Sequence, residues 1–170
     1  MSRFKKKHIW MLGAVLILLF ISVLAYKWHV KTDPENAFEE FCFAKGFAED
    51  QLMDPLILAG EEVIPIVIES VKNHATPRRR SAIGFLGNAK ADKALPTLVT
   101  ILNDEAEPNY IRADALIAIA MIKLSKGKEL SKRFEQNEGF LGYIAKKVLS
   151  EERQLLQRRT FFDALFRRHY

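Results

Sequence analysis

Residues 60–87 read GEEVIPIVIESVKNHATPRRRSAIGFLG, and residues 91–120 read ADKALPTLVTILNDEAEPNYIRADALIAIA. Both stretches follow one pattern, in which apolar residues recur at helical spacing after a proline and again after an arginine. The prolines, Pro65 and Pro96, are 31 residues apart, and each is expected just inside a helix start, where a missing N–H is tolerated. A repeat of this period predicts an all-α fold, a short α-solenoid of stacked helix pairs.

The arginines and alanines of the pattern also repeat. Arg79 and Arg112 are 33 residues apart, because the second copy has two extra residues in the loop near Asn109. Ala82 and Ala115 follow each arginine by three residues, where two helices are expected to approach closely. We therefore interpret these positions as structural, and we expect the arginines to pair with acids in neighbouring loops, such as Asp104 or Glu105.

This pattern resembles the HEAT-like repeats of bacterial proteins, including the short repeats named after phycobilisome lyases. The positions that carry the resemblance are Pro65 and Pro96 in the second helix of a pair, with Arg79, Arg112, Ala82 and Ala115 in the first helix of the next. It covers roughly half of the chain, from about Asp54 to about Leu130. The resemblance implies the fold and leaves the function open, because similar repeats serve unrelated tasks.

Helix signals extend on both sides of the repeats. Asp33-Pro34 and Asp54-Pro55 each predict a helix start, and Thr76 is expected to cap the helix that follows Pro77. A less regular third unit follows from Lys126 to about Ser150. We divide the chain into a basic N-terminus at 1–8, an apolar helix at 9–26, a HEAT-like repeat domain at 33–150 and a basic amphipathic helix at 151–170.

The apolar segment predicts a membrane anchor. Ile9–Tyr26 contains no charged residue, is long enough to span a bilayer as a helix, and is flanked by Trp10 and Trp28. The excess of Lys and Arg before it predicts a single-pass inner-membrane protein with its N-terminus inside and its repeats outside the cytoplasm. The alternative is a signal peptide that is cleaved after Ala25, which would also deliver the domain outside the cytoplasm.

The charge pattern argues against nucleic acid as a partner. The formal net charge is +5, but the basic residues concentrate at the two ends, including Arg3, Lys5, Lys6 and Lys7. The repeat region between these ends is close to neutral, unlike the basic face of a nucleic-acid-binding domain. The single cysteine, Cys42, excludes an internal disulfide, and we expect it to be a buried apolar residue.

No catalytic, cofactor or metal residue is predicted from motifs. None of the four histidines is followed by Glu, and a single cysteine gives no zinc pattern. Gly84 and Gly87 belong to a helix rather than to a phosphate loop, and no Gly-x-Ser-x-Gly elbow surrounds Ser81. We therefore predict a protein that is not an enzyme and needs no cofactor. Lyase activity, which the resemblance implies for some relatives, is the remaining enzymatic alternative.

Two arginine-rich segments are candidate partner or lipid contacts. Arg78-Arg79-Arg80 could bind an acidic partner, or it could be neutralised within the repeats. The helix predicted after Glu151 could cap the last repeat, or its basic face could contact anionic lipid or a partner. The candidate contact residues are Arg78, Arg80, Arg158, Arg159, Arg167 and Arg168.

These observations predict a membrane-anchored, extracytoplasmic scaffold or accessory subunit that binds envelope proteins through its helical surface. Two alternatives remain open. The chain could be a lyase or lyase chaperone that holds a ligand in a concave groove, or a cytoplasm-facing regulator if the topology is inverted.

Overall fold

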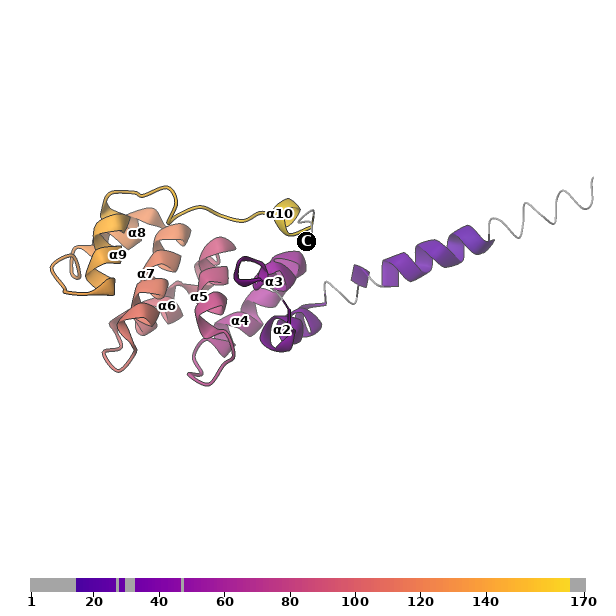
Figure 1. The fold of residues 1–170 in the computed structure, drawn as a ribbon, viewed down its shortest axis with the longest axis horizontal. Helices are drawn as coiled ribbons and strands as arrows, with labels where there is room; N and C mark the ends of the chain where they lie inside the picture. The colour runs from indigo at the N-terminus through magenta and orange to yellow at the C-terminus, as the bar shows by residue number, and fades with distance from the viewer. Residues whose placement is uncertain (1–14, 27, 30–32, 47, 166–170) are drawn as a thin grey trace, which may run out of the picture.

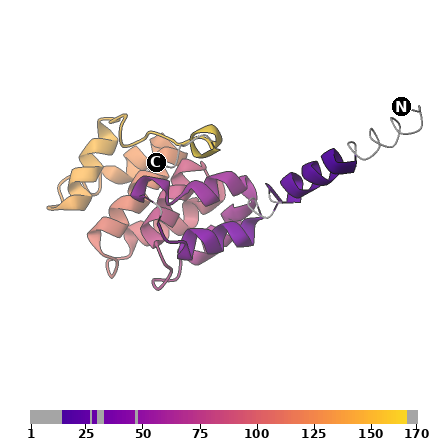
Figure 2. The same cartoon turned by 45° about the vertical axis from the view of Figure 1, so that its right-hand side comes forward.

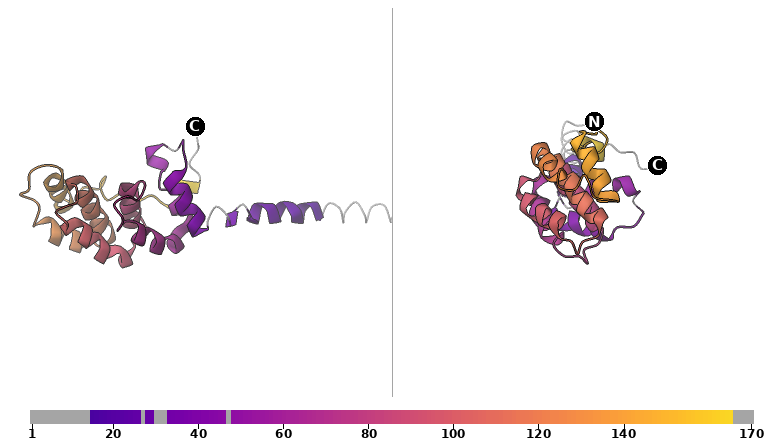
Figure 3. Two further views of the ribbon diagram at one scale, coloured as in Figure 1. Left: turned by 90° about the horizontal axis from the view of Figure 1, so that it is seen from below. Right: turned by 90° about the vertical axis from the view of Figure 1, so that its left-hand side faces the viewer.

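The computed structural model describes residues 15–26, 28–29, 33–46 and 48–165, and none of these residues lies in a β-strand. The all-α class is therefore confirmed for this part of the chain. The α-helices (α) and 3-10 helices (η) are α2 (Pro34–Phe43), η1 (Glu49–Gln51), α3 (Asp54–Ala59), η2 (Gly60–Val63), α4 (Ile64–Ser70), α5 (Arg79–Asn88), η3 (Asp92–Ala94), α6 (Leu95–Asn103), α7 (Asn109–Ile122), α8 (Leu124–Ser131), α9 (Phe140–Leu149) and α10 (Phe161–Leu165). From α2 to α9 they follow one another across the body in chain order (Figures 1 and 3).

Helix α7 is the central element of the body, and it packs against α5, α6, α8 and α9. Small residues bring the helix axes close together. A Cβ atom added to Gly87 of α5 would lie 2.7 Å from the Cα of Ala118, and one added to Gly127 of α8 would lie 2.5 Å from the Cβ of Ala120. The buried side of α7 comprises Ile111, Ala113, Ala115, Leu116, Ala118, Ile119 and Ala120.

Most predicted helix boundaries are confirmed. The carboxylate of Asp33 accepts a 3.0 Å hydrogen bond from the Asn36 amide and caps α2. Pro65 and Pro96 lie in the first turns of α4 and α6. The prediction for Thr76 is wrong, because its hydroxyl donates to the Ser70 carbonyl at 2.7 Å and does not cap α5.

The repeated arginines make the same hydrogen bond in both copies. Arg79 Nε donates to the Val71 carbonyl at 2.7 Å, and Arg112 Nε donates to the Leu102 carbonyl at 2.9 Å. Each acceptor lies at the end of the preceding helix, where the last carbonyls have no partner within the helix. The arginines therefore join each helix to the one before it.

The remaining core agrees with the pattern of apolar residues. Cys42 is buried, as expected, and burial raises the pKa of its thiol. The third unit forms α8 and α9, whose buried side chains include Leu130, Leu141, Ile144 and Val148. These residues join those of the first two units in a single hydrophobic cluster.

The prediction of a helix from Glu151 onward is wrong for residues 151–160. These residues form turns followed by an extended segment, and we call residues 151–160 the strap. The strap returns from α9 across the body to α10, and α10 packs against α3 (Figure 1). Glu151 has a left-handed φ of 55°, which interrupts helical geometry directly after α9. The C-terminal segment therefore covers the first helices instead of capping the last ones. Residues 166–170 lie outside the described part.

The predicted membrane span at Ile9–Tyr26 is also corrected. No helix in the described part of the chain is both long enough and apolar enough to cross a membrane. Residues 15–26 are helical and exposed, and they project from the body (Figure 2). Residues 9–14 of this prediction lie outside the described residues. The inner-membrane assignment, which depended on this span, is not supported.

Candidate functional site: a groove between α5 and α7

A groove with a volume of about 980 Å³ lies where α5, α7, the turn before α3 and the strap meet. Its lining combines charged side chains with apolar ones. The residues that line it are Glu49, Leu52, Met53, His74, Arg78, Arg79, Arg80, Ser81, Gly84, Glu107, Pro108, Tyr110, Ile111, Asp114 and Arg159. The groove therefore brings the Arg78–Arg80 run, which the sequence singled out, next to three carboxylates.

A buried ion pair forms one wall of the groove. The two terminal nitrogens of Arg79 donate to the two carboxylate oxygens of Glu107, at 2.9 and 2.5 Å. Both side chains are buried, and the Nε of the same guanidinium is bonded to Val71. This bidentate geometry satisfies both charges and fixes the loop before α7 to the start of α5. The predicted partner was Asp104 or Glu105, so the structure moves the pairing to Glu107 of the same loop.

A second, more exposed pair lies at the rim. Arg80 Nε donates to the Asp114 carboxylate at 2.6 Å, and the guanidinium lies 5.2 Å from the ring centroid of Tyr110. The ring is 47% exposed. Burial raises the pKa of Asp114 and outweighs the opposing hydrogen bond from Arg80, while that hydrogen bond raises the pKa of Arg80. The rim therefore presents an aromatic ring whose orientation is held by a paired arginine.

Arg78 has a structural role. It occupies the N-cap of α5 with a left-handed φ of 54°, and its guanidinium donates to the carbonyls of Phe41 and Ala44. These acceptors belong to the end of α2, where a positive charge is favourable. All three arginines of the run thus have partners within the chain, which agrees with the structural interpretation of this segment. Both candidate contacts, Arg78 and Arg80, therefore already have acceptors within the chain.

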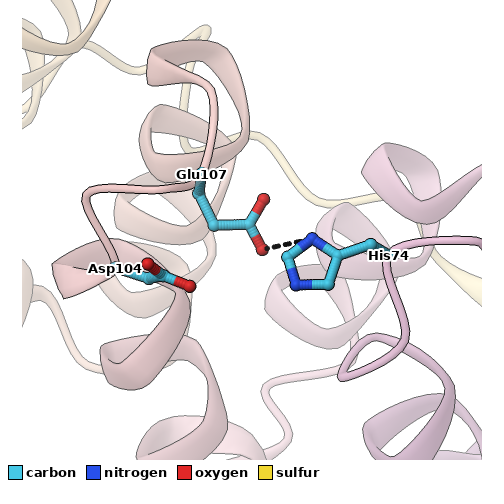
Figure 4. A group of neighbouring side chains, drawn as sticks. All are labelled: His74, Asp104 and Glu107. Atoms are coloured by element: carbon cyan, nitrogen blue, oxygen red, sulfur yellow. Dashed lines mark ion pairs between the residues drawn. The ribbon is translucent and has the colours of Figure 1, made fainter.

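His74, Asp104 and Glu107 form a cluster beside the buried pair (Figure 4). Their potential ligand atoms lie within 4.8 Å of one another, and His74 Nδ1 is 3.4 Å from Glu107 Oε1. Nitrogen and oxygen ligands of this kind can hold a divalent cation. However, the Glu107 carboxylate is already neutralised by Arg79, so a cation there would lie next to a guanidinium. The cluster is better suited to joining the α4–α5 and α6–α7 loops.

The strap contributes the remaining predicted contacts. Arg158 Nε donates to the Asn88 carbonyl at 2.7 Å, and Arg159 reaches the groove. Arg167 and Arg168 lie outside the described residues. Sequence analysis missed Asn88, which is buried at the end of α5. One signal could have revealed it. The equivalent position of the second copy is the apolar Met121, so Asn88 is a polar residue at a position where the other copy has an apolar one.

Comparison of the chain with protein-family models, with curated proteins and with solved structures finds no match. The chain's function must therefore be argued from the groove itself.

Proposed function

We propose that this chain is a non-catalytic protein-binding module, built from HEAT-like helix pairs, whose groove between α5 and α7 accepts an extended segment of a partner protein. The observation that carries the proposal is the exposed Tyr110 ring, held by Arg80 beside the groove. Tyrosine and arginine are enriched among the residues that dominate protein–protein binding energy, because tyrosine offers a large, rigid contact area and arginine offers a planar group with several hydrogen-bond donors.

Two further observations support this function. The bonds of Arg79 to Val71 and of Arg112 to Leu102 are equivalent in the two helix pairs, as expected for stacked repeats. The ion pairs of the groove are formed within the chain, so its shape is fixed before a partner arrives. A preformed surface loses less conformational entropy on binding than a flexible one.

Gly84 provides a way to block the groove. It lies on α5 in the groove lining, and a Cβ atom added to it would meet only Met53 Sδ, at 3.8 Å. Gly84→Leu should therefore fill the groove while α5 remains helical. Thr100→Leu places the same side chain at an exposed position on α6 and serves as the matched control.

The experiment selects displayed random peptides on the full chain and measures their binding by fluorescence anisotropy. We expect Gly84→Leu to weaken binding at least about tenfold, the loss of roughly 1.4 kcal/mol, and Thr100→Leu to leave it unchanged. Tyr110→Ala should also weaken binding, because it removes the aromatic rim. Peptides that bind wild type and Gly84→Leu equally, or a failure to select any peptide, would contradict the proposed function.

A further inference from the structure

We infer that the groove recognises a carboxylate in an acidic peptide segment and that Arg159 is the residue that binds it; this rests on the proposed function. Arg159 lines the groove, and within the described residues its guanidinium donates no hydrogen bond and pairs with no carboxylate. Its Nη1 atom is buried. A guanidinium carries five N–H donors, and a partly buried one without an acceptor is unfavourable.

Arg159 differs in this respect from its neighbours. Arg79 and Arg80 are bonded to Glu107 and Asp114, and Arg158 is bonded to the Asn88 carbonyl. The charges of Arg79 and Arg80 are therefore balanced inside the molecule and Arg158 has an acceptor, whereas the guanidinium of Arg159 has neither a counter-charge nor an acceptor among the described residues. An incoming anion would complete this part of the groove without breaking an existing pair.

The position of Arg159 is fixed by its backbone. Its N–H donates to Asn88 Oδ1 at 2.6 Å, and its carbonyl accepts from Asn88 Nδ2 at 3.0 Å. Asn88 is buried, so the strap is attached at the residue whose side chain enters the groove. The backbone from which the guanidinium extends is thus held independently of any ligand, as the support of a recognition group should be.

The surroundings of Arg159 favour a carboxylate over a polyanion. Arg79 and Arg80 are already paired with Glu107 and Asp114, so Arg159 offers counter-charge for one acid and not for a chain of phosphates, and Glu49 adds a negative charge to the same lining. Leu52, Met53 and Ile111 add apolar surface to the same lining. An acidic residue flanked by apolar ones fits this combination, because arginine binds a carboxylate through two parallel hydrogen bonds.

The test uses the peptides selected on the full chain, their versions with Glu and Asp replaced by Gln and Asn, and three variants. Arg159→Gln removes the charge, Arg159→Lys keeps the charge without the planar fork, and Arg153→Gln makes the same charge change at an exposed position of the strap. Because the bonds to Asn88 involve the backbone of Arg159, all three should retain the wild-type melting curve.

We expect the selected peptides to be enriched in Asp or Glu beside apolar residues. Arg159→Gln should weaken their binding by about tenfold or more, Arg159→Lys should weaken it less, and Arg153→Gln should leave it unchanged. For the neutral peptides, wild type and Arg159→Gln should bind alike, which shows that the acid and Arg159 act on each other.

Two results would overturn the inference. The first is that peptides whose binding is blocked by Gly84→Leu contain no acidic residue, or bind Arg159→Gln as well as wild type. The proposed function would then hold, but recognition of a carboxylate by Arg159 would not. Inorganic phosphate that binds the full chain through Arg159, while peptide acids have no effect, would assign the site to a free anion. Failure of the proposed function gives a different result, because Gly84→Leu would then bind the selected peptides as tightly as wild type does.

Discussion

Asn88 and Arg159 are 71 residues apart in the chain and are joined by two hydrogen bonds, between the side-chain amide of Asn88 and the backbone N–H and carbonyl of Arg159. The contact has the donor and acceptor pattern of two paired strands, with an asparagine side chain in place of one backbone. A buried side chain at the end of α5 thus attaches a segment from the other end of the sequence.

Replacing Asn88 with Ala should loosen the strap at Arg159. The Arg159 N–H and carbonyl would lose their partners, which should lower the free energy of unfolding by about 1–3 kcal/mol. Urea unfolding measures this change, and hydrogen exchange should show faster exchange at the Arg159 amide. Asn103→Ala is the control, because the side chain of the exposed Asn103 donates to the Val99 carbonyl of its own helix. Similar losses for both variants would contradict a special role for Asn88.

Replacing Gly84 and Gly87 of α5 with alanine should change the free energy of unfolding in opposite directions. Gly84→Ala should raise the free energy of unfolding by about 0.5–1 kcal/mol, because the added Cβ makes an ordinary van der Waals contact with Met53 Sδ at 3.8 Å and alanine favours a helix. Gly87→Ala should lower it by about 1–3 kcal/mol, because the new Cβ would collide with the Ala118 backbone. Thermal melts of the two variants check this. Equal shifts would mean that α5 and α7 are not in close contact.

Breaking the buried pair should be costly. Glu107→Gln leaves the Arg79 guanidinium buried without a counter-charge, and the expected loss is about 3–5 kcal/mol. The double variant Arg79→Met with Glu107→Leu should recover most of it, because no buried charge remains. Glu69→Gln removes an exposed partner of Lys72 and should cost less than about 1 kcal/mol. Denaturant titrations compare them, and a small loss for Glu107→Gln would show that Arg79 finds another acceptor.

Asp114 should make stability depend on pH. Its pKa is raised in the folded chain, so the folded state retains this proton at pH values where the unfolded state has released it. Its contribution to stability is therefore largest below the ordinary pKa of aspartate and is lost as the pH rises through the raised pKa. The stability of wild type relative to Asp114→Asn should decrease over that window when both are unfolded at about pH 3 to 7. An increase would mean that the pair with Arg80 outweighs burial.

The sequence predicted the parts of the fold that local chemistry controls. Capping by Asp33, the start of α3 at Asp54-Pro55 and the prolines at the starts of α4 and α6 depend on neighbouring residues alone, and all were confirmed. The strap could not be predicted in this way. Its residues have a helical apolar pattern, but Asn88 and the surface of α3 offer partners that are distant in sequence.

The candidate site was predictable only in part, for the same reason. The arginine run marks where the groove forms, but the choice of Glu107 over Asp104 or Glu105 depends on how the loop before α7 turns. Asp104 instead accepts a hydrogen bond from the Ala106 amide within that loop. The placement of Arg159 opposite α5 depends on the path of the whole strap. Side chains that meet through long-range packing leave no local pattern to detect.

The strap also sets the order in which the protein can fold during synthesis. A helical array whose units contact only their neighbours can assemble progressively as each unit emerges from the ribosome. Here α3 gains its contact with α10 only after α9 and the strap have been translated. The first helices to be made are therefore among the last to be completely covered, and formation of this long-range contact should slow the final step of folding. Until then α3 presents an incompletely covered surface to the cell.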